Sequence, residues 1–259
     1  MITSGDNKHI KNVIRLLAKS KVRKEQDSFV IEGIKLFEEA PLDLIKEVYV
    51  SENCDYRSPK LDKVPHEMVK EEVFRKMTDT LSPQGILCVV SKKHWTLSGI
   101  LESDKERDPI FLVLETVQDP GNLGTIVRTA EGAGVSGIIM NNDTVDIFNP
   151  KTVRSTMGSV FRVPFVYEDD LKKSVEALKR AGVTCFAAHL KGQRSCYETD
   201  FKRPAAFFIG NEGNGLSDEL SAMADELIKI PMGGRLESLN AAVSAALLSY
   251  EARRQRLSG

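Results

Sequence analysis

The hydrophobic residues near the start of the chain recur at helical spacing and then give way to short apolar runs. Ile10, Val13, Ile14, Leu17 and Ala18 predict a helix over residues 8–24. Further short helices are expected over residues 34–40 and 70–77, and short strands over residues 29–33, 47–51 and 85–91. This mixture predicts a small α/β domain at residues 1–92.

From residue 109 onward, apolar runs alternate with amphipathic stretches. Strands are expected over residues 110–115, 137–140, 163–166, 184–188, 205–209 and 227–230. Helices are expected over residues 123–131, 151–157, 170–181, 217–222 and 239–254. This alternation predicts an α/β domain at 109–259 whose mostly parallel sheet is covered by helices on both faces. Ligands of such sheets bind beyond the C-terminal ends of the strands.

The stretch between these two domains is polar, apart from Leu97, Ile100 and Leu101, which fit one amphipathic turn. We therefore expect a linker at residues 93–108. No secretory signal and no membrane-spanning run is expected, and the four cysteines form no Cys-x-x-Cys pair. This composition predicts a cytoplasmic protein with reduced thiols. The four histidines are isolated, so no metal site is predicted.

Charge is distributed unevenly along a chain whose net charge is only −1. Residues 1–35 carry eight lysines and arginines against four acidic residues. A basic arm of this kind can attract a polyanion such as RNA. A solvated helix face is the alternative interpretation of the same residues.

Three segments of the second domain combine turn residues with polar side chains that suit chemistry. In the first, Glu115 to Ala130, a strand is followed by a Pro-Gly turn and a helix. Asn122 suits the N-cap of that helix, Gly132 and Gly134 suit its end, and Arg128 lies about two turns in. A plain cap and a surface ion pair would explain Asn122 and Arg128 equally well.

The second segment, Phe208 to Ser217, places three glycines around Glu212 directly after an apolar strand. Glycines permit close approach of a ligand, although a simple turn is the alternative. In the third segment, Ile230 to Asn240, a Pro turn and two glycines precede the last helix. Ser238 is expected to cap that helix, which leaves Asn240 in its first turn.

Together these segments resemble the three motifs of the SpoU (TrmH-like) family of S-adenosylmethionine-dependent RNA ribose 2′-O-methyltransferases, of the SPOUT class. The resemblance rests on Asn122-x-Gly124-x-x-x-Arg128, on Gly210-Asn211-Glu212-Gly213-x-Gly215-Leu216-Ser217, and on Ile230-Pro231-Met232 through Ser238-Leu239-Asn240. It covers residues 108–256. Around Arg23-Lys24 and Phe29 to Gly33, the chain also resembles the L30e-like substrate-binding domain that precedes many such enzymes.

The resemblance implies a trefoil knot, a homodimer formed through the knotted domain, and an rRNA substrate, most naturally 23S rRNA. It implies that S-adenosylmethionine is held mainly by backbone. The residues implied in cofactor binding are His189, Leu190, Gly210, Asn211, Gly213, Ile230, Met232 and Leu239. A side chain at Gly210 or Gly213 is expected to fill the space of the adenosine. Helix 239–254 and Asn149 to Lys151 are expected at the dimer interface.

For catalysis, the resemblance implies roles for Arg128, Asn122, Glu212, Ser238 and Asn240. Arg128 would act either as the base or as a clamp on a substrate phosphate, and a guanidinium is a poor base because it stays protonated. The RNA contacts are expected at Lys21, Arg23, Lys24 and Arg128.

Other classes of protein would leave different signatures in this sequence. A dinucleotide-binding Rossmann enzyme would need Gly-x-Gly-x-x-Gly after an early strand, which Gly121 to Gly124 does not match. A non-catalytic RNA-binding protein on a knotted scaffold would be expected to lack Arg128 or the cofactor glycines, which are present. A tRNA substrate and a role in antibiotic resistance both stay open.

Overall fold

The computed structural model describes residues 1–102, 108–211 and 213–257. The chain forms two compact units, of which the first comprises Met1–Lys93 and Asp146–Phe161 and the second His94–Val145 and Arg162–Gly259. The expected domain ranges 1–92 and 109–259, and the linker 93–108, stay predictions. Part of that linker, Leu97–Glu102, forms helix α5, whose Ile100 is buried in the core of the second unit.

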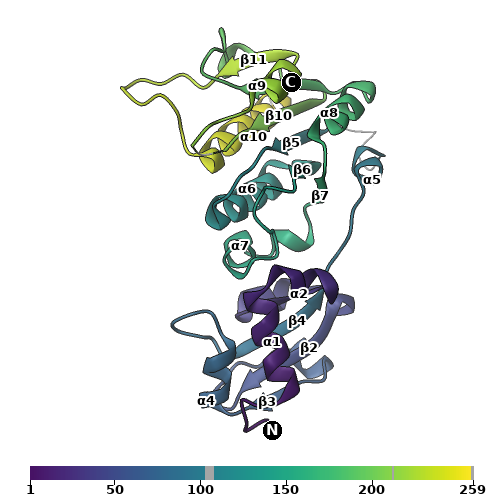
Figure 1. The fold of residues 1–259 in the computed structure, drawn as a ribbon, viewed down its shortest axis with the longest axis vertical. Coiled ribbons are helices and arrows are strands. Elements are labelled where there is room, and N and C mark those ends of the chain that lie inside the picture. The colour runs from purple at the N-terminus through teal and green to yellow at the C-terminus, as the bar shows by residue number, and fades with distance from the viewer. Residues whose placement is uncertain (103–107, 212, 258–259) are drawn as a thin grey trace. The chain divides into compact units, whose positions relative to one another are not determined.

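The sheet of the first unit has four strands in the order β1-β4-β2-β3; of these, β2, β3 and β4 are labelled in Figure 1. Their bounds are β1 (Ser28–Glu32), β2 (Ile45–Ser51), β3 (Glu67–Val69) and β4 (Ile86–Ser91). β4 pairs antiparallel with β1 and β2, whereas β3 is parallel to β2. The short strands expected from apolar runs are therefore present, and β3 is an addition.

Helices α1 (Lys8–Ala18), α2 (Ser20–Glu25), α3 (Ile34–Glu39), α4 (Glu71–Phe74) and α7 (Pro150–Thr156) complete the first unit. The single helix expected over residues 8–24 is interrupted at Lys19, whose backbone is extended with φ −127°. On α1, Ile10 and Val13 of the predicted pattern are buried in the core beside Tyr49, together with Leu16, whereas Ile14 is 38% exposed and Leu17 is half-buried.

The second unit contains a seven-stranded sheet in which every pair of neighbours is parallel, in the order β7-β6-β5-β10-β8-β11-β9. The strand bounds are β5 (Ile110–Leu114), β6 (Gly137–Asn141), β7 (Phe165–Glu168), β8 (Thr184–Ala188), β9 (Arg194–Ser195), β10 (Ala205–Ile209) and β11 (Glu226–Lys229). The predicted parallel α/β fold is confirmed. The trefoil knot stays a prediction.

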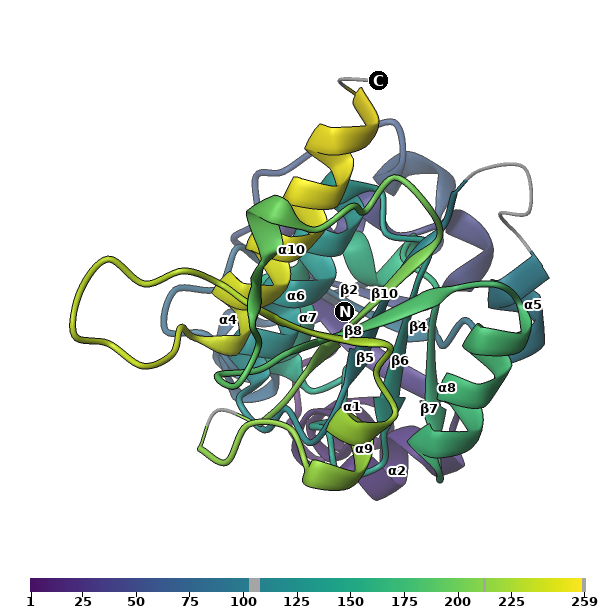
Figure 2. The ribbon, with the colours of Figure 1, turned by 90° about the horizontal axis from the view of Figure 1, so that it is seen from above.

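Helices cover both faces of this sheet, as Figure 2 shows. They are α6 (Pro120–Ala133), α8 (Leu171–Arg180), α9 (Asp218–Ala222) and α10 (Ala241–Leu257), together with α5. Apolar residues of α5, α8 and α9 share one core with Phe111, Val113 and Phe208 of the central strands. Helices α6 and α10 pack against each other on the opposite face. Within the described residues, no helix is both long enough and apolar enough to cross a membrane.

Candidate active site

The three predicted motifs converge at one edge of the seven-stranded sheet. The four central strands β5, β10, β8 and β11 are neighbours in the sheet and run parallel, so their C-terminal ends lie at the same edge. Directly after these strands come Glu115, Gly210, His189 and Ile230. This is the edge at which parallel α/β sheets bind ligands.

The helix that carries Arg128 begins at a different cap from the one expected. Asp119, not Asn122, is the N-cap of α6, and its carboxylate accepts a hydrogen bond from the Asn122 backbone N–H at 2.8 Å. Pro120 occupies the first turn, where its missing N–H costs nothing. Because Asp119 supplies the cap, the Asn122 side chain can turn toward another segment.

That other segment is the start of α10, where the expected cap is also corrected. Asn240, rather than Ser238, caps the helix, because its Oδ1 accepts from the backbone N–H of Ala242 at 2.9 Å and of Val243 at 3.3 Å. Its Nδ2 donates to Oδ1 of Asn122 at 3.0 Å, which joins the first motif to the third. Ser238 is exposed and forms no hydrogen bond within the part of the chain that the structure describes.

Arg128 lies on the exposed side of α6. With the residues that the structure describes, its guanidinium forms no hydrogen bond and no ion pair. A surface arginine with a structural partner would not be available for a substrate, so this arrangement suits a phosphate or a developing oxyanion. Glu212, the carboxylate expected to assist Arg128, lies outside the described residues.

The second motif forms a loop that folds back on itself. Asn211 and Gly215 exchange backbone hydrogen bonds of 3.0 and 2.9 Å, and Oδ1 of Asn211 accepts from the N–H of Gly213 and Asn214. A Cβ added at Gly210 would come within 2.1 Å of the Gly215 carbonyl carbon. The close backbone contact therefore requires a glycine here, and the expectation that a side chain would also fill the adenosine space stays a prediction.

Two residues at the end of β5, neither of them named as a site residue from the sequence, anchor this loop. The carboxylate of Glu115 accepts from both the backbone N–H and the hydroxyl of Ser217, each at 2.7 Å. The carbonyl of Thr116 accepts from Nδ2 of Asn211 at 2.8 Å. An acidic residue directly after a buried strand was the only sequence signal for Glu115. The backbone conformation of Thr116 had no such signal.

The loop after β8 lies against the end of β11. The His189 N–H donates to the Ile228 carbonyl at 2.9 Å, and Nδ1 of His189 accepts from the Lys191 N–H at 3.0 Å. Gly192, which the sequence did not single out, packs so closely that an added Cβ would come within 2.5 Å of the Ile228 carbonyl carbon. Leu190, in contrast, is 66% exposed.

The segment between β11 and α10 is a long loop, visible as the yellow-green excursion in Figures 1 and 2. Of the residues expected to bind cofactor there, Ile230, Met232 and Leu239 are half-buried. Gly233 and Gly234 have open space around their Cα atoms, so packing does not explain them.

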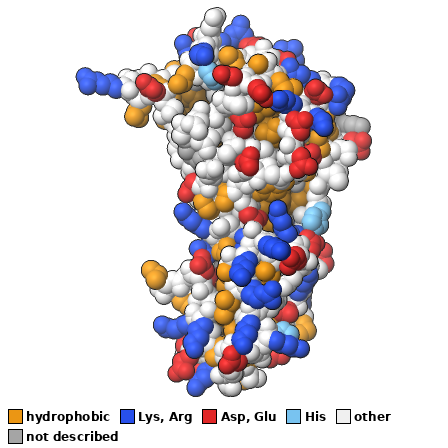
Figure 3. All heavy atoms as spheres, viewed as in Figure 1, with side chains coloured by type: hydrophobic (Ala, Val, Ile, Leu, Met, Phe, Trp, Pro, Cys, Tyr) orange, Lys and Arg blue, Asp and Glu red, His pale blue; other side chains and the backbone are white. Residues whose placement is uncertain are grey.

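The residues expected to contact RNA in the first unit divide into two kinds. Lys21 and Lys24 are exposed, and Figure 3 shows lysine and arginine side chains gathered over α1 and α2. Arg23 is only 4% exposed and donates to the Leu16 carbonyl at 2.7 Å and to the Asp146 carboxylate at 2.9 and 2.8 Å. These bonds correct the expectation that Arg23 contacts RNA, because its guanidinium is already satisfied inside the protein.

Comparisons with known proteins agree with this geometry. Residues 109–250 match the model of the SpoU rRNA Methylase family, and residues 7–88 match the MRM3-like substrate binding domain. The chain is 35% identical to the 23S rRNA (guanosine(2553)-2′-O)-methyltransferase RlmP of Bacillus subtilis, over 97% of this chain and 98% of that protein.

Solved structures resemble the chain to different extents. An AdoMet-bound rRNA methyltransferase from Sinorhizobium meliloti superposes with a TM-score of 0.86 and 34% identity, covering 98% of this chain and 97% of its own. A TrmH/SpoU tRNA modifying enzyme from A. aeolicus reaches a TM-score of 0.53 at 27% identity and covers 62% of this chain and 83% of its own. Because the SpoU rRNA Methylase model matches more than half of this chain, the chain belongs to that family.

Proposed function

We propose that this protein transfers a methyl group from S-adenosylmethionine to a ribose 2′-hydroxyl of 23S rRNA. One observation carries the proposal: the Asn122–Asn240 hydrogen bond and the Glu115–Ser217 contacts gather the three motifs at one sheet edge, and α6, which begins there, carries the exposed Arg128. A relative that matches nearly the whole chain is named for this reaction on 23S rRNA.

The cofactor site that we propose is built from the backbone of the three loops. The residues that would hold S-adenosylmethionine are His189, Leu190, Gly210, Asn211, Gly213, Ile230, Met232 and Leu239. Two close backbone contacts support this assignment: Gly210 lies against Gly215 within the loop after β10, and Gly192 brings the loop after β8 against Ile228 at the end of β11. When bound, the cofactor supplies a methyl group already activated by its sulfonium, so orientation becomes a large part of catalysis.

The acceptor side of the site, where the ribose that receives the methyl group would bind, would be formed by α6 and the start of α10. During transfer, the ribose 2′-oxygen bonds to the methyl carbon, the C–S bond breaks toward sulfur, and the hydroxyl proton leaves to water or to an RNA phosphate. Arg128 would serve as a fixed cation that holds a phosphate or stabilises the forming oxyanion, since a guanidinium stays protonated. Asn122 and Asn240 orient each other. Ser238 and Glu212 would help to orient the ribose.

The extent of the structural matches favours rRNA over tRNA. Both units of this chain are matched by the rRNA methyltransferase from Sinorhizobium meliloti, whereas the tRNA enzyme matches 62% of it. The first unit would then bring the rRNA to the site through Lys21, Lys24 and other exposed basic residues of α1 and α2. A cytoplasmic location, where rRNA is found, is part of this proposal.

We further propose that the protein is a homodimer through the exposed side of α10. There Val243 is 46% and Tyr250 48% exposed, and Tyr197 beside them is 54% exposed. A hollow of about 480 Å³ lies on this side and is lined by Tyr197, Ala246, Leu247, Tyr250, Glu251 and Arg254. Exposed apolar surface with a concave centre suits a second copy of the chain. The predicted role of Asn149 to Lys151 at this interface has no further support.

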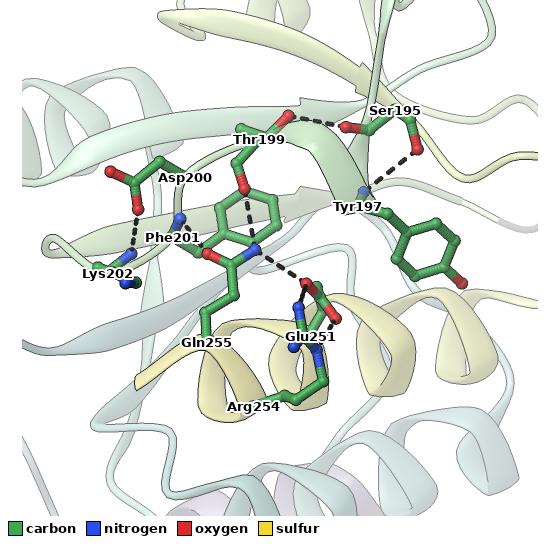
Figure 4. Close-up of polar contacts among 9 residues, drawn as sticks. All are labelled: Ser195, Tyr197, Thr199, Asp200, Phe201, Lys202, Glu251, Arg254 and Gln255. Atoms are coloured by element: carbon green, nitrogen blue, oxygen red, sulfur yellow. Dashed lines mark hydrogen bonds and ion pairs between the residues drawn. The ribbon is translucent and has the colours of Figure 1, made fainter. Parts of the chain in front are cut away.

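The surface around this hollow is held in place by hydrogen bonds, which Figure 4 shows. Gln255 accepts from the Phe201 N–H at 2.8 Å and donates to the Thr199 carbonyl and to the Glu251 carboxylate, each at 2.9 Å. Arg254 donates to the same carboxylate at 2.8 and 2.7 Å. Such preorganisation lowers the entropy cost of association. Sedimentation should give a dimer for the wild type and a monomer for Tyr197→Glu, with Tyr197→Phe as the dimeric control.

The methyl transfer itself can be tested with purified protein, S-adenosylmethionine and 23S rRNA from cells lacking this gene. Mass spectrometry of nuclease fragments should show one new 2′-O-methylribose. Arg128→Ala should abolish it while cofactor binding, measured by calorimetry, persists. Arg180→Ala is the matched control, because Arg180 is an exposed arginine of α8 paired at 3.8 Å with Glu176. Methylation of a base, or wild-type turnover by Arg128→Ala, would refute the proposal in its reaction or in its mechanism.

A further inference from the structure

Thr116 has an unusual backbone conformation at the point where β5 leaves the sheet. Its φ is +59°, in the left-handed region that a β-branched residue rarely adopts. Such a conformation persists only where the surrounding structure holds it, and it is found most often near functional sites.

Asn141, the last residue of β6, bonds Thr116 through both the oxygen and the nitrogen of its side-chain amide. Oδ1 of Asn141 accepts from the Thr116 N–H at 2.8 Å, and Nδ2 donates to the Thr116 hydroxyl at 2.8 Å. The hydroxyl of Thr144 donates to the same Oδ1 at 2.8 Å and fixes which way the Asn141 amide faces. One side chain on the neighbouring strand thus bonds two of the three polar groups of Thr116, its N–H and its hydroxyl.

The conformation of Thr116 determines where its carbonyl lies. Rotation about φ swings this carbonyl relative to β5, and in the present conformation it accepts from Nδ2 of Asn211 at 2.8 Å. Asn211 in turn uses Oδ1 to hold the N–H groups of Gly213 and Asn214. A continuous chain of hydrogen bonds therefore runs from Asn141 through Thr116 to the loop proposed to bind the cofactor.

We propose that Asn141 and Thr116 are positioning residues, which set the loop around Asn211 in the shape that binds S-adenosylmethionine. This inference rests on the proposed function for its ligand. The positioning itself is a property of the free protein. It predicts that Asn141 matters because Thr116 needs support at positive φ, and that a glycine at position 116 makes this support unnecessary.

A double-mutant cycle tests this dependence. Asn141→Ala should weaken S-adenosylmethionine binding by about tenfold, the effect of losing well-placed hydrogen bonds. In the Thr116→Gly background, the same change should weaken binding by no more than about threefold. Thr116→Gly alone should stay within about threefold of the wild type. Calorimetric titration measures each affinity. Asn142→Ala is the matched control, because Asn142 is the adjacent asparagine and bonds Asp169 instead.

Equal losses from Asn141→Ala in both backgrounds would overturn the proposed dependence on Thr116, as would wild-type affinity in Asn141→Ala itself. A structural effect alone would lower the melting temperature without this rescue by glycine. Saturating cofactor should restore most of the turnover of Asn141→Ala, so the change appears in KM for S-adenosylmethionine more than in kcat. A loss confined to kcat would contradict a role in placing the cofactor loop.

Hydrogen exchange without cofactor separates this inference from the proposed function. Amides of Gly213, Asn214 and Ser217 should exchange at least about fivefold faster in Asn141→Ala than in the wild type or in Asn142→Ala. If the wild type binds no S-adenosylmethionine, the proposed function fails and the exchange rates still decide whether Asn141 positions the loop. Unchanged exchange in Asn141→Ala would refute the positioning role whatever the protein binds.

Discussion

Asn240 and Asn122 meet through a single 3.0 Å hydrogen bond although 118 positions separate them along the chain. The same Asn240 side chain caps α10 through its oxygen, so its amide nitrogen is directed toward Asn122. A helix cap and a contact between two motifs are thereby provided by one residue. Any displacement of the start of α10 would move the acceptor side of the proposed active site.

Replacing Asn240 by serine should separate these two roles. Serine is a good N-cap, but it is too short to reach Asn122, so α10 should keep its stability while the contact between the motifs is lost. We expect methyl transfer to fall by about tenfold, the effect of one lost hydrogen bond in an oriented site. Asn240→Ala should lose the same activity and also about 1 kcal/mol of stability. Equal melting temperatures of the two variants would contradict the capping role.

A methyl group at Gly210 should destabilise the folded protein even in the absence of cofactor. An added Cβ would meet the Gly215 carbonyl carbon at 2.1 Å and the Leu216 nitrogen at 2.3 Å, and neither backbone can move without opening the loop. Overpacking of this kind costs about 1–3 kcal/mol, so Gly210→Ala should lower the melting temperature of the free protein. At Gly5, the nearest atom would be 3.9 Å away, so Gly5→Ala is the control. Normal stability of Gly210→Ala with weak cofactor binding would instead favour the adenosine explanation.

Much of the fold could be predicted from the chain, because its strands are apolar runs and its helices are amphipathic. β3 and β9 were missed for a physical reason. Glu67–Val69 and Arg194–Ser195 are too short to show a pattern and exist as strands through pairing with β2 and β11. Short segments of this kind are defined by tertiary contacts rather than by local preference.

The site could be located by its motifs, but its hydrogen bonds could not be assigned. Both expected caps were wrong, although Asp119 followed by Pro120 is a recognisable helix start. Nothing local indicates that Thr116 adopts positive φ, because the conformation depends on Asn141 from another strand. Contacts between residues far apart in sequence follow from the order of the strands, which no single motif contains.

The buried pair of Arg23 and Asp146 should stabilise the first unit more than any surface pair does. Arg23→Met would remove the guanidinium donors to Oδ2 of Asp146 and to the Leu16 carbonyl, although Oδ1 of Asp146 would still accept from the Phe148 N–H. We expect a loss of about 3 kcal/mol, the lower end for a broken buried pair, because Asp146 keeps some exposure to water. Lys21→Met is the control, since Lys21 pairs with Glu25 at 3.9 Å on the surface and should change stability by less than about 0.5 kcal/mol.

Of these two substitutions, Lys21→Met should cost less stability but should have the larger effect on RNA binding. Lys21→Met removes an exposed positive charge and should weaken rRNA binding and its dependence on salt, whereas Arg23→Met should leave both unchanged at a temperature where the variant is folded. Filter binding at several salt concentrations measures this. A salt dependence reduced by Arg23→Met alone would restore the sequence-based assignment of Arg23 to the RNA interface.

The buried thiols should make the protein less stable at high pH. Burial raises the pKa of Cys185 to about 12 and raises the pKa of Cys88 further. In the unfolded chain a thiol loses its proton near pH 8.5, so above that pH the unfolded state releases protons that the folded state keeps. The free energy of unfolding should therefore fall by about 1.4 kcal/mol per pH unit for each such thiol until the folded pKa is reached.

Urea unfolding between pH 8 and pH 10 measures the slope of the unfolding free energy against pH. Cys88→Ala should make this slope shallower by the contribution of one thiol, about 1.4 kcal/mol per pH unit. This holds whatever the substitution does to stability at neutral pH. An identical slope in the wild type and in Cys88→Ala would show that the Cys88 thiol ionises equally in both states.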